Sequence, residues 1–202
     1  SKDWVTFSLN LLGDCGEIGK FQYAPLIGPD ILSGILVNTT GRSVFDFATE
    51  YLFTPLGIEV KNKITFSSEE EQVAFLKAKD INGWVIDSCG INAAGWGLTL
   101  STRAMAKIGQ LYLNQGRWNK QQIVSKQWVI DSIKKQSYND ELNLAYGYLW
   151  WLHQDGFMAM GDGGNVIYVN IMKKTVISIT ATFKPDAVSY THLRAHETDS
   201  YL

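Results

Sequence analysis

The sequence predicts an α+β fold in which a helical region is followed by an antiparallel sheet meander. Two observations carry this prediction. Apolar residues recur at helical spacing as far as Lys135, and after Tyr146 the pattern changes to short apolar runs typical of strands. The runs are joined by short turns, which favour antiparallel pairing over the alternating order of nucleotide-binding folds. With 202 residues, 46% of them hydrophobic, the chain can bury a core.

Local helix signals divide the helical region into segments. An amphipathic pattern begins at Trp4, and a buried helix is predicted over 30–37 with Gly41 as its C-terminal cap. Serine N-caps predict three further helices, over 44–53, 102–114 and 126–135. The span 61–88 is more polar, with a helix start at 67–71 and a turn at 82–83.

Four strands are predicted in the meander, over 148–152, 157–160, 166–170 and 175–182. Trp150 and Trp151 are adjacent in the first of them and are therefore expected on opposite faces. We accordingly expect at most one of the two in the core, the other covering a helix or lining a cleft. His153 follows this strand and is expected at the surface.

Charge and composition exclude several classes of function. A net charge of −2 with no run of Lys or Arg indicates no basic surface that would bind nucleic acid or an anionic membrane. The expected partner is therefore a small neutral molecule. Cys15 and Cys89, the two cysteines, lie far apart in no metal or redox motif, and we expect no metal and no cofactor. They are either thiols or one disulfide. No apolar run has the length of a membrane span, and the compartment stays open.

Both ends of the chain have unusual patterns. An amphipathic pattern begins almost at residue 1, so we expect the chain to start within a longer protein. Residues 188–202 break the apolar pattern before them and resemble a translated sequencing-library adapter, the alternative being a genuine polar tail. The expected organisation is a hydrolase-domain portion over 1–187 and a non-native tail over 188–202, which removes His192 and His196 from any site.

Several segments in this order resemble the serine beta-lactamase-like and penicillin-binding-protein-like hydrolase superfamily. The class C beta-lactamase, esterase and 6-aminohexanoate-dimer hydrolase branches are the most similar. The segments that carry the resemblance are 21–23, 31–36, 51–58, 94–109, 116–119 and 161–165, and the similarity covers roughly residues 3–187. It implies a partial beta-lactamase/transpeptidase-like fold, and it is compatible with an extracytoplasmic location without deciding the compartment.

The resemblance also implies a chemistry. In the family, the serine of an SxxK motif attacks an ester or amide carbonyl, a lysine and a tyrosine move the proton, and backbone N–H groups stabilise the oxyanion. Tyr23 matches that tyrosine, which can act as a base only where neighbouring positive charge favours its phenolate. Gly161, Asp162 and Gly163 match the turn that contributes to the oxyanion hole, and Trp96 is a candidate wall of the substrate pocket.

Each candidate has an ordinary structural interpretation beside the functional one. Tyr23 is an aromatic residue at a helix entrance, the glycine turn is also a favoured hairpin tip, and Trp96 is equally suited to loop packing. Two departures from the family pattern bear on the substrate. Pro25 stands where the family has an asparagine, and Ala159 precedes the glycine turn where many members carry a cation or imidazole. The second departure favours a neutral ester or amide over a carboxylate-bearing lactam.

The sequence lacks a serine and lysine in the family position. Its one literal SxxK, Ser132 to Lys135, follows the tyrosine motif and is interpreted as a solvated helix end. We therefore expect a parent serine hydrolase whose nucleophile lies outside this sequence, and a chain that is inactive alone. The alternatives are a non-catalytic module that binds peptide or cell-wall fragments in the same cleft, and an unrelated α+β binding domain.

Overall fold

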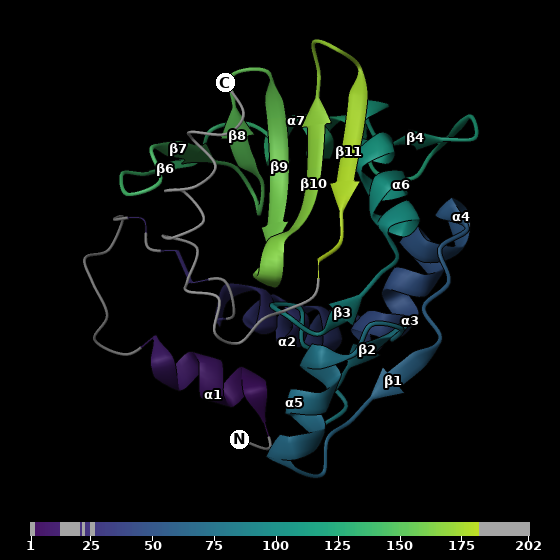
Figure 1. Ribbon diagram of the computed structural model, residues 1–202, viewed down its shortest axis with the longest axis vertical. Helices are drawn as coiled ribbons and strands as arrows, with labels where there is room; N and C mark the ends of the chain where they lie inside the picture. The colour runs from purple at the N-terminus through teal and green to yellow at the C-terminus, as the bar shows by residue number, and fades with distance from the viewer. Residues whose placement is uncertain (1–2, 13–20, 22, 25–26, 182–202) are drawn as a thin grey trace.

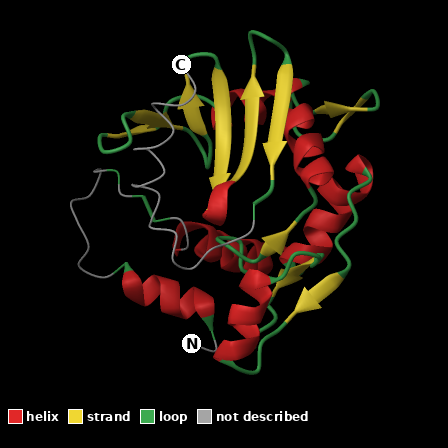
Figure 2. Ribbon diagram, in the orientation of Figure 1, coloured by secondary structure: helices red, strands yellow, loops and turns green. Residues whose placement is uncertain are grey.

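A six-stranded antiparallel sheet stands above a group of helices in the protein (Figure 1), whose computed structural model describes residues 3–12, 21, 23–24 and 27–181. Helices α1 (Trp4–Leu11), α2 (Ile27–Thr40) and α5 (Glu69–Lys77) lie below the sheet in this view. Helix α6 (Thr102–Leu113) runs along one side of it (Figure 2). The separation of helices and strands confirms the predicted α+β class.

Each strand of this sheet pairs antiparallel with the next strand along the chain. The strands are β6 (Ser137–Asn139), β7 (Leu144–Tyr146), β8 (Trp151–His153), β9 (Gly156–Gly161), β10 (Asn165–Asn170) and β11 (Thr175–Ile179). The predicted meander is therefore confirmed from β8 onward. Strands β6 and β7 were not predicted, and β8 begins three residues later than expected because a turn occupies residues 147–150.

Helix α6 packs directly on the last two strands of the sheet. The Ser101 hydroxyl oxygen accepts the Ala104 N–H at 3.2 Å, which confirms the predicted N-cap. Gly109 lies in the middle of the helix, where a Cβ would stand only 2.6 Å from Val176 Cγ1 and 2.9 Å from Ile167 Cγ2. A glycine is therefore required for the helix to approach β10 and β11 this closely.

The helical half has the predicted caps but one longer helix. Helix α2 ends at Thr40 and is followed by Gly41, which adopts the left-handed φ of 68°. Ser43 caps α3 (Val44–Ala48) by accepting the Asp46 N–H. The chain continues through a π turn (Thr49–Phe53) into α4 (Thr54–Leu56) and leaves the helical path at Gly57. The prediction that the helix ends at 53 is wrong by one turn, because a proline is tolerated near the start of a helical segment, where its missing N–H is not needed.

A second, smaller sheet lies in the span where no strand was predicted. Strand β1 (Asn62–Ile64) pairs parallel with β2 (Gly83–Val85), and β2 pairs antiparallel with β3 (Leu98–Thr99). Helix α5 connects β1 to β2, and its predicted start is confirmed by the Ser68 side chain, which accepts the Glu71 N–H. The remaining elements are the short hairpin of β4 (Arg117–Trp118) and β5 (Gln121–Gln122), and α7 (Lys126–Ser132), which ends three residues before the predicted boundary.

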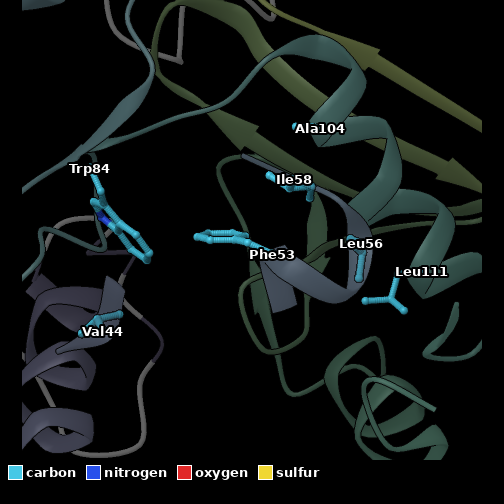
Figure 3. Close-up of a cluster of buried hydrophobic side chains, with 7 residues drawn as sticks. All are labelled: Val44, Phe53, Leu56, Ile58, Trp84, Ala104 and Leu111. Carbon is cyan, nitrogen blue, oxygen red and sulfur yellow. The ribbon is translucent and has the colours of Figure 1, made fainter. Parts of the chain in front are cut away.

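Two clusters of buried side chains form the core. The first joins the helical half to the small sheet, and in Figure 3 the ring of Phe53 points toward Trp84, the two ring centroids being 6.1 Å apart. The second lies between α6 and the large sheet and includes Phe157 and Val169. Ile108 of α6 packs against both clusters, so this helix connects the two parts of the core.

Trp150 and Trp151 are both buried, with 6% and 2% of their surfaces exposed. The expectation that at most one belongs to the core is therefore wrong. Trp150 packs against Tyr112 of α6 and Phe157, while the ring of Trp151 contacts Tyr146. Both sides of the sheet are covered at this point, so each tryptophan has its own set of aromatic partners. His153 is exposed, as predicted.

Candidate active site

Tyr23 lies in a non-helical segment ahead of α2, with its ring half-buried against the large sheet. Its ring centroid is 5.0 Å from that of Trp151 and 5.9 Å from that of Tyr146, and the ring stands nearly perpendicular to Tyr146 at 82°. Phe21 also contacts the Tyr146 ring, at 5.5 Å. Tyr23 is thus held by rings from two strands, although it is distant from them in the sequence.

The two rings under Tyr23 form a cross-strand pair. Tyr146 of β7 is directly opposite Trp151 of β8, and side chains that face each other across antiparallel strands point to the same side of the sheet. Their centroids are 4.5 Å apart. The turn between them is closed by the Gly147 N–H, which donates to the Trp150 carbonyl at 2.8 Å. The register of one tight hairpin therefore places both rings.

Gly147 allows this hairpin to rest against α7. A Cβ at Gly147 would lie 2.1 Å from the Ser132 carbonyl oxygen, and that same oxygen accepts the Tyr148 N–H at 2.8 Å. Ser132 itself is 1% exposed, and its hydroxyl donates to the Val129 carbonyl. Ser132 is accordingly a buried residue at a helix-to-hairpin contact. The expectation of a solvated helix end is wrong for Ser132 and holds for Lys134 and Lys135, which are exposed.

Burial raises the pKa of the Tyr146 phenol well above its ordinary value, and the neighbouring Tyr23 raises it further. Tyr146 therefore stays protonated near neutral pH.

The glycine turn lies at the same end of the sheet as Tyr146 and Trp151. Trp151 is paired with Met158, three residues before β9 ends at Gly161, a distance of about 10 Å along a strand. A short 3-10 turn (Asp162–Gly164) connects β9 to β10 at the lower end of β9 in Figure 1, with Gly163 and Gly164 at φ 77° and 92°. The turn is a hairpin tip, and its left-handed residues are glycines for that conformational reason. Whether it also forms an oxyanion hole stays a prediction.

Trp96 belongs to a different aromatic cluster. Its ring contacts are with Trp4, Phe66 and Phe75, at centroid distances of 5.4, 6.2 and 6.4 Å. These residues come from α1, the segment after β1, and α5. The contacts favour the loop-packing interpretation of Trp96, and a role as a wall of the Tyr23 site stays a prediction.

Buried polar side chains hold the loop that carries Trp96, and the sequence did not single them out. Asp87 accepts the Trp4 N–H at 3.1 Å and the N–H groups of Cys89 and Ile91 at 2.9 and 2.8 Å. A third N–H of the loop, that of Gly95, donates to Asp30 of α2 at 3.1 Å. The only sequence signal for this network is an aspartate two residues before Cys89 and three before Gly90, a common turn pattern.

Several sequence predictions fall on residues outside the described part of the chain. These are Cys15, Pro25 and the 188–202 tail.

Cys89 is exposed. Among the described residues, no helix has the length and apolar content needed to cross a bilayer. Within the same residues, no group of three or more His, Cys, Asp or Glu is arranged to hold a metal ion.

The chain is similar in structure to two solved bacterial proteins. One is assigned as a 6-aminohexanoate-dimer hydrolase from Bacillus anthracis, with a TM-score of 0.65 and 21% identity over 91% of this chain and 43% of that one. The other is a penicillin-binding protein homologue from Caulobacter crescentus, with a TM-score of 0.61 and 10% identity over 84% of this chain and 55% of that one. This chain spans about half the length of either protein or less.

At the level of sequence, neither a protein-family model nor a curated protein matches the chain. The structural comparison is therefore the one that bears on the predicted resemblance. Both matched proteins belong to the superfamily that the sequence motifs predict. The chain has the fold of the serine beta-lactamase-like and penicillin-binding-protein-like superfamily.

Proposed function

We propose that this chain is the portion of a serine hydrolase that carries the catalytic tyrosine, Tyr23, and one side of the oxyanion hole. The observation that carries the proposal is the place of Tyr23, on the Tyr146 and Trp151 rings at the same end of the sheet as the glycine turn. The nucleophilic serine and its lysine lie outside this sequence. The domain portion comprises residues 1–187, and the chain alone is inactive.

In this proposal, Tyr23 relays a proton between the serine hydroxyl and the leaving group of an ester or amide. The serine oxygen attacks the carbonyl carbon, the serine proton passes to the leaving group, and water later hydrolyses the acyl-enzyme. A backbone N–H at Gly161 to Gly163 stabilises the negative oxygen that forms in each step. Ala159, which carries no charge near this turn, supports a neutral substrate.

The experiment is to extend the reading frame upstream in the source DNA and express the longer protein. Turnover of a nitrophenyl ester and of nitrocefin, and labelling by a fluorophosphonate probe, report the acyl-enzyme chemistry. We expect Tyr23→Phe to lower kcat by about a hundredfold to ten-thousandfold, the usual contribution of a general acid–base group. Tyr138→Phe, an exposed tyrosine in the same sheet, is the matched control and should retain activity.

Two results would contradict the proposal. One is ester turnover by the 202-residue chain at rates well above those of its Tyr23→Phe variant, because the chain would then be active without the missing serine. The other is a longer protein that fails to react with the fluorophosphonate. That second result would favour the alternative of a non-catalytic module for peptide or cell-wall fragments, which Ala159 and Pro25 motivate as departures from the family's catalytic pattern.

A further inference from the structure

The aromatic pair beneath Tyr23 consists of the buried Trp151 and the half-buried Tyr146, both held in the sheet. Trp151 is 2% exposed, and Tyr146 is paired with it across two hydrogen-bonded strands. The hairpin that joins them is fixed against α7 at Gly147, where no side chain fits. The Tyr23 ring, which rests on this pair, therefore has few possible positions, because one hairpin holds both Tyr146 and Trp151 and the two rings cannot move independently.

The geometry points to Tyr146 as a positioning residue for Tyr23, and this inference rests on the proposed function. We infer that the edge-on contact with the Tyr146 ring keeps Tyr23 against Trp151 and so fixes where its phenol oxygen stands. The contact is nearly perpendicular, which is a favoured arrangement of aromatic rings. Tyr146 acts through its ring and not through proton transfer.

The hydroxyl of Tyr146 has a different consequence from its ring. Burial holds this phenol in its neutral form, so it does not compete with Tyr23 for the role of base. Removing the hydroxyl while keeping the ring should accordingly leave the site intact. Removing the ring should displace Tyr23 even though Trp151 is unchanged.

The first test measures the nuclear Overhauser contact between the Tyr23 and Trp151 rings in the 202-residue chain. Tyr23→Phe assigns the Tyr23 signals, and neither ring of the measured contact is altered in the test variants. In Tyr146→Ala we expect the intensity of this contact to fall at least about twofold, and in Tyr146→Phe we expect it to be unchanged. Tyr138→Ala, an exposed aromatic residue of the neighbouring strand, is the matched control and should leave the contact intact.

If Tyr146→Ala does not fold, Tyr146→Leu replaces it, because leucine fills the site without supplying an aromatic edge. Contacts between Tyr112 and Trp150, on the other side of the sheet, report whether the fold is intact in each variant. An unchanged Tyr23 to Trp151 contact in a folded Tyr146→Ala or Tyr146→Leu variant would overturn the inference.

The second test concerns the reaction itself in the longer protein. Tyr146→Ala should lower kcat by about tenfold to a hundredfold with little change in KM, since a displacement of about 1 Å at a reacting group has this effect, and Tyr146→Phe should restore kcat. A lost ring contact with unchanged kcat would refute the positioning role. A longer protein with no Tyr23-dependent turnover would instead refute the hydrolase proposal, while the ring contact still decides how Tyr146 acts on Tyr23.

Discussion

Buried side-chain oxygens connect segments that are far apart in the sequence. Asp30 of α2 accepts an N–H from the Trp96 loop, and Asn92 of the same loop accepts the Phe45 N–H at the start of α3 at 3.0 Å. Both residues are less than a tenth exposed. A buried backbone N–H that loses its acceptor costs about 1–3 kcal/mol, so these side chains contribute to the relative placement of α2, α3 and the loop.

The charge on Asp30 opposes folding, because burial raises the pKa of its carboxyl above the ordinary value of 3.8. At pH values between the pKa of Asp30 in the unfolded chain and its higher pKa in the folded protein, the folded state binds more protons. The free energy of unfolding therefore falls as pH rises through this window. Asp30→Asn keeps an acceptor for the Gly95 N–H and removes the charge. We expect its melting temperature to exceed that of the unmutated protein at neutral pH, with the difference shrinking as the pH falls through the same window.

Thermal unfolding followed by circular dichroism at several pH values measures this difference. Asp140→Asn, which neutralises an exposed carboxylate, serves as the control and should show no such convergence. A difference that stays constant with pH would refute the assigned cause.

Gly109 determines how closely α6 packs on the sheet. A methyl group there would contact Val176 and Ile167 at distances that real Cβ atoms do not adopt, so the helix or the strands must move. Overpacking of this kind costs about 1–3 kcal/mol, which exceeds the gain of up to about 1 kcal/mol that alanine brings to a helix.

We therefore expect Gly109→Ala to lower the melting temperature by about 2–4 °C for each kcal/mol of net loss in a domain of this size. Gly28→Ala in α2 is the matched control, because its Cβ would meet no atom within 4 Å. Its melting temperature should be unchanged or higher. Equal behaviour of the two variants in a thermal melt would contradict the close packing of α6.

The helices were predictable because their signals are local. Ser43, Ser101 and Ser125 each cap the helix that the sequence assigned to them, and Ser68 caps the helix whose start was predicted at 67–71. Strands β1 to β3 were not predictable, because they are two or three residues long and β1 pairs in parallel with a strand on the far side of α5. For such strands the pairing depends on residues that are distant in the sequence and not on a local alternation of apolar and polar residues.

At the scale of the whole molecule, one face of the large sheet is packed on α6 and the opposite face is partly open. Val176 faces α6, so Ile177 and Ile179, which alternate with Ser178 along β11, point to the other face. They are 48% and 50% exposed. Apolar side chains on the last strand of a sheet favour association with other chains.

We expect the double variant Ile177→Lys and Ile179→Lys to raise the monomer fraction in size-exclusion chromatography with light scattering. The melting temperature should change little, because the two side chains are half exposed. Thr175→Lys, at an exposed position of the same strand, adds charge without removing apolar surface and is the control. Self-association that persists in the double variant would locate the associating surface elsewhere.

The sequence predicted the members of the candidate site better than their partners. Tyr23 and the glycine turn were singled out by resemblance, and the sheet register brings them to the same end of the fold. Tyr146 was not singled out, and Trp151 was one of two adjacent tryptophans of which one was expected to cover a helix or line a cleft. The pairing of Tyr146 with Trp151 depends on a turn at 147–150 that interrupts an apparent strand. The contacts of Trp96 with Trp4 and Phe75 depend on the packing of α1 and α5 beside its loop, which no local pattern specifies.

The pairing of each strand of the large sheet with its neighbour along the chain has a consequence for how the site assembles. Every hairpin of the meander closes a short loop, whereas the contact of Tyr23 with Tyr146 closes most of the helical half into one large loop. The entropy lost in closing a flexible loop grows only with the logarithm of its length, so that doubling it costs about 0.6 kcal/mol. Changes in length within surface loops of the helical half should therefore be tolerated, provided that the segment carrying Tyr23 still reaches the hairpin of β7 and β8.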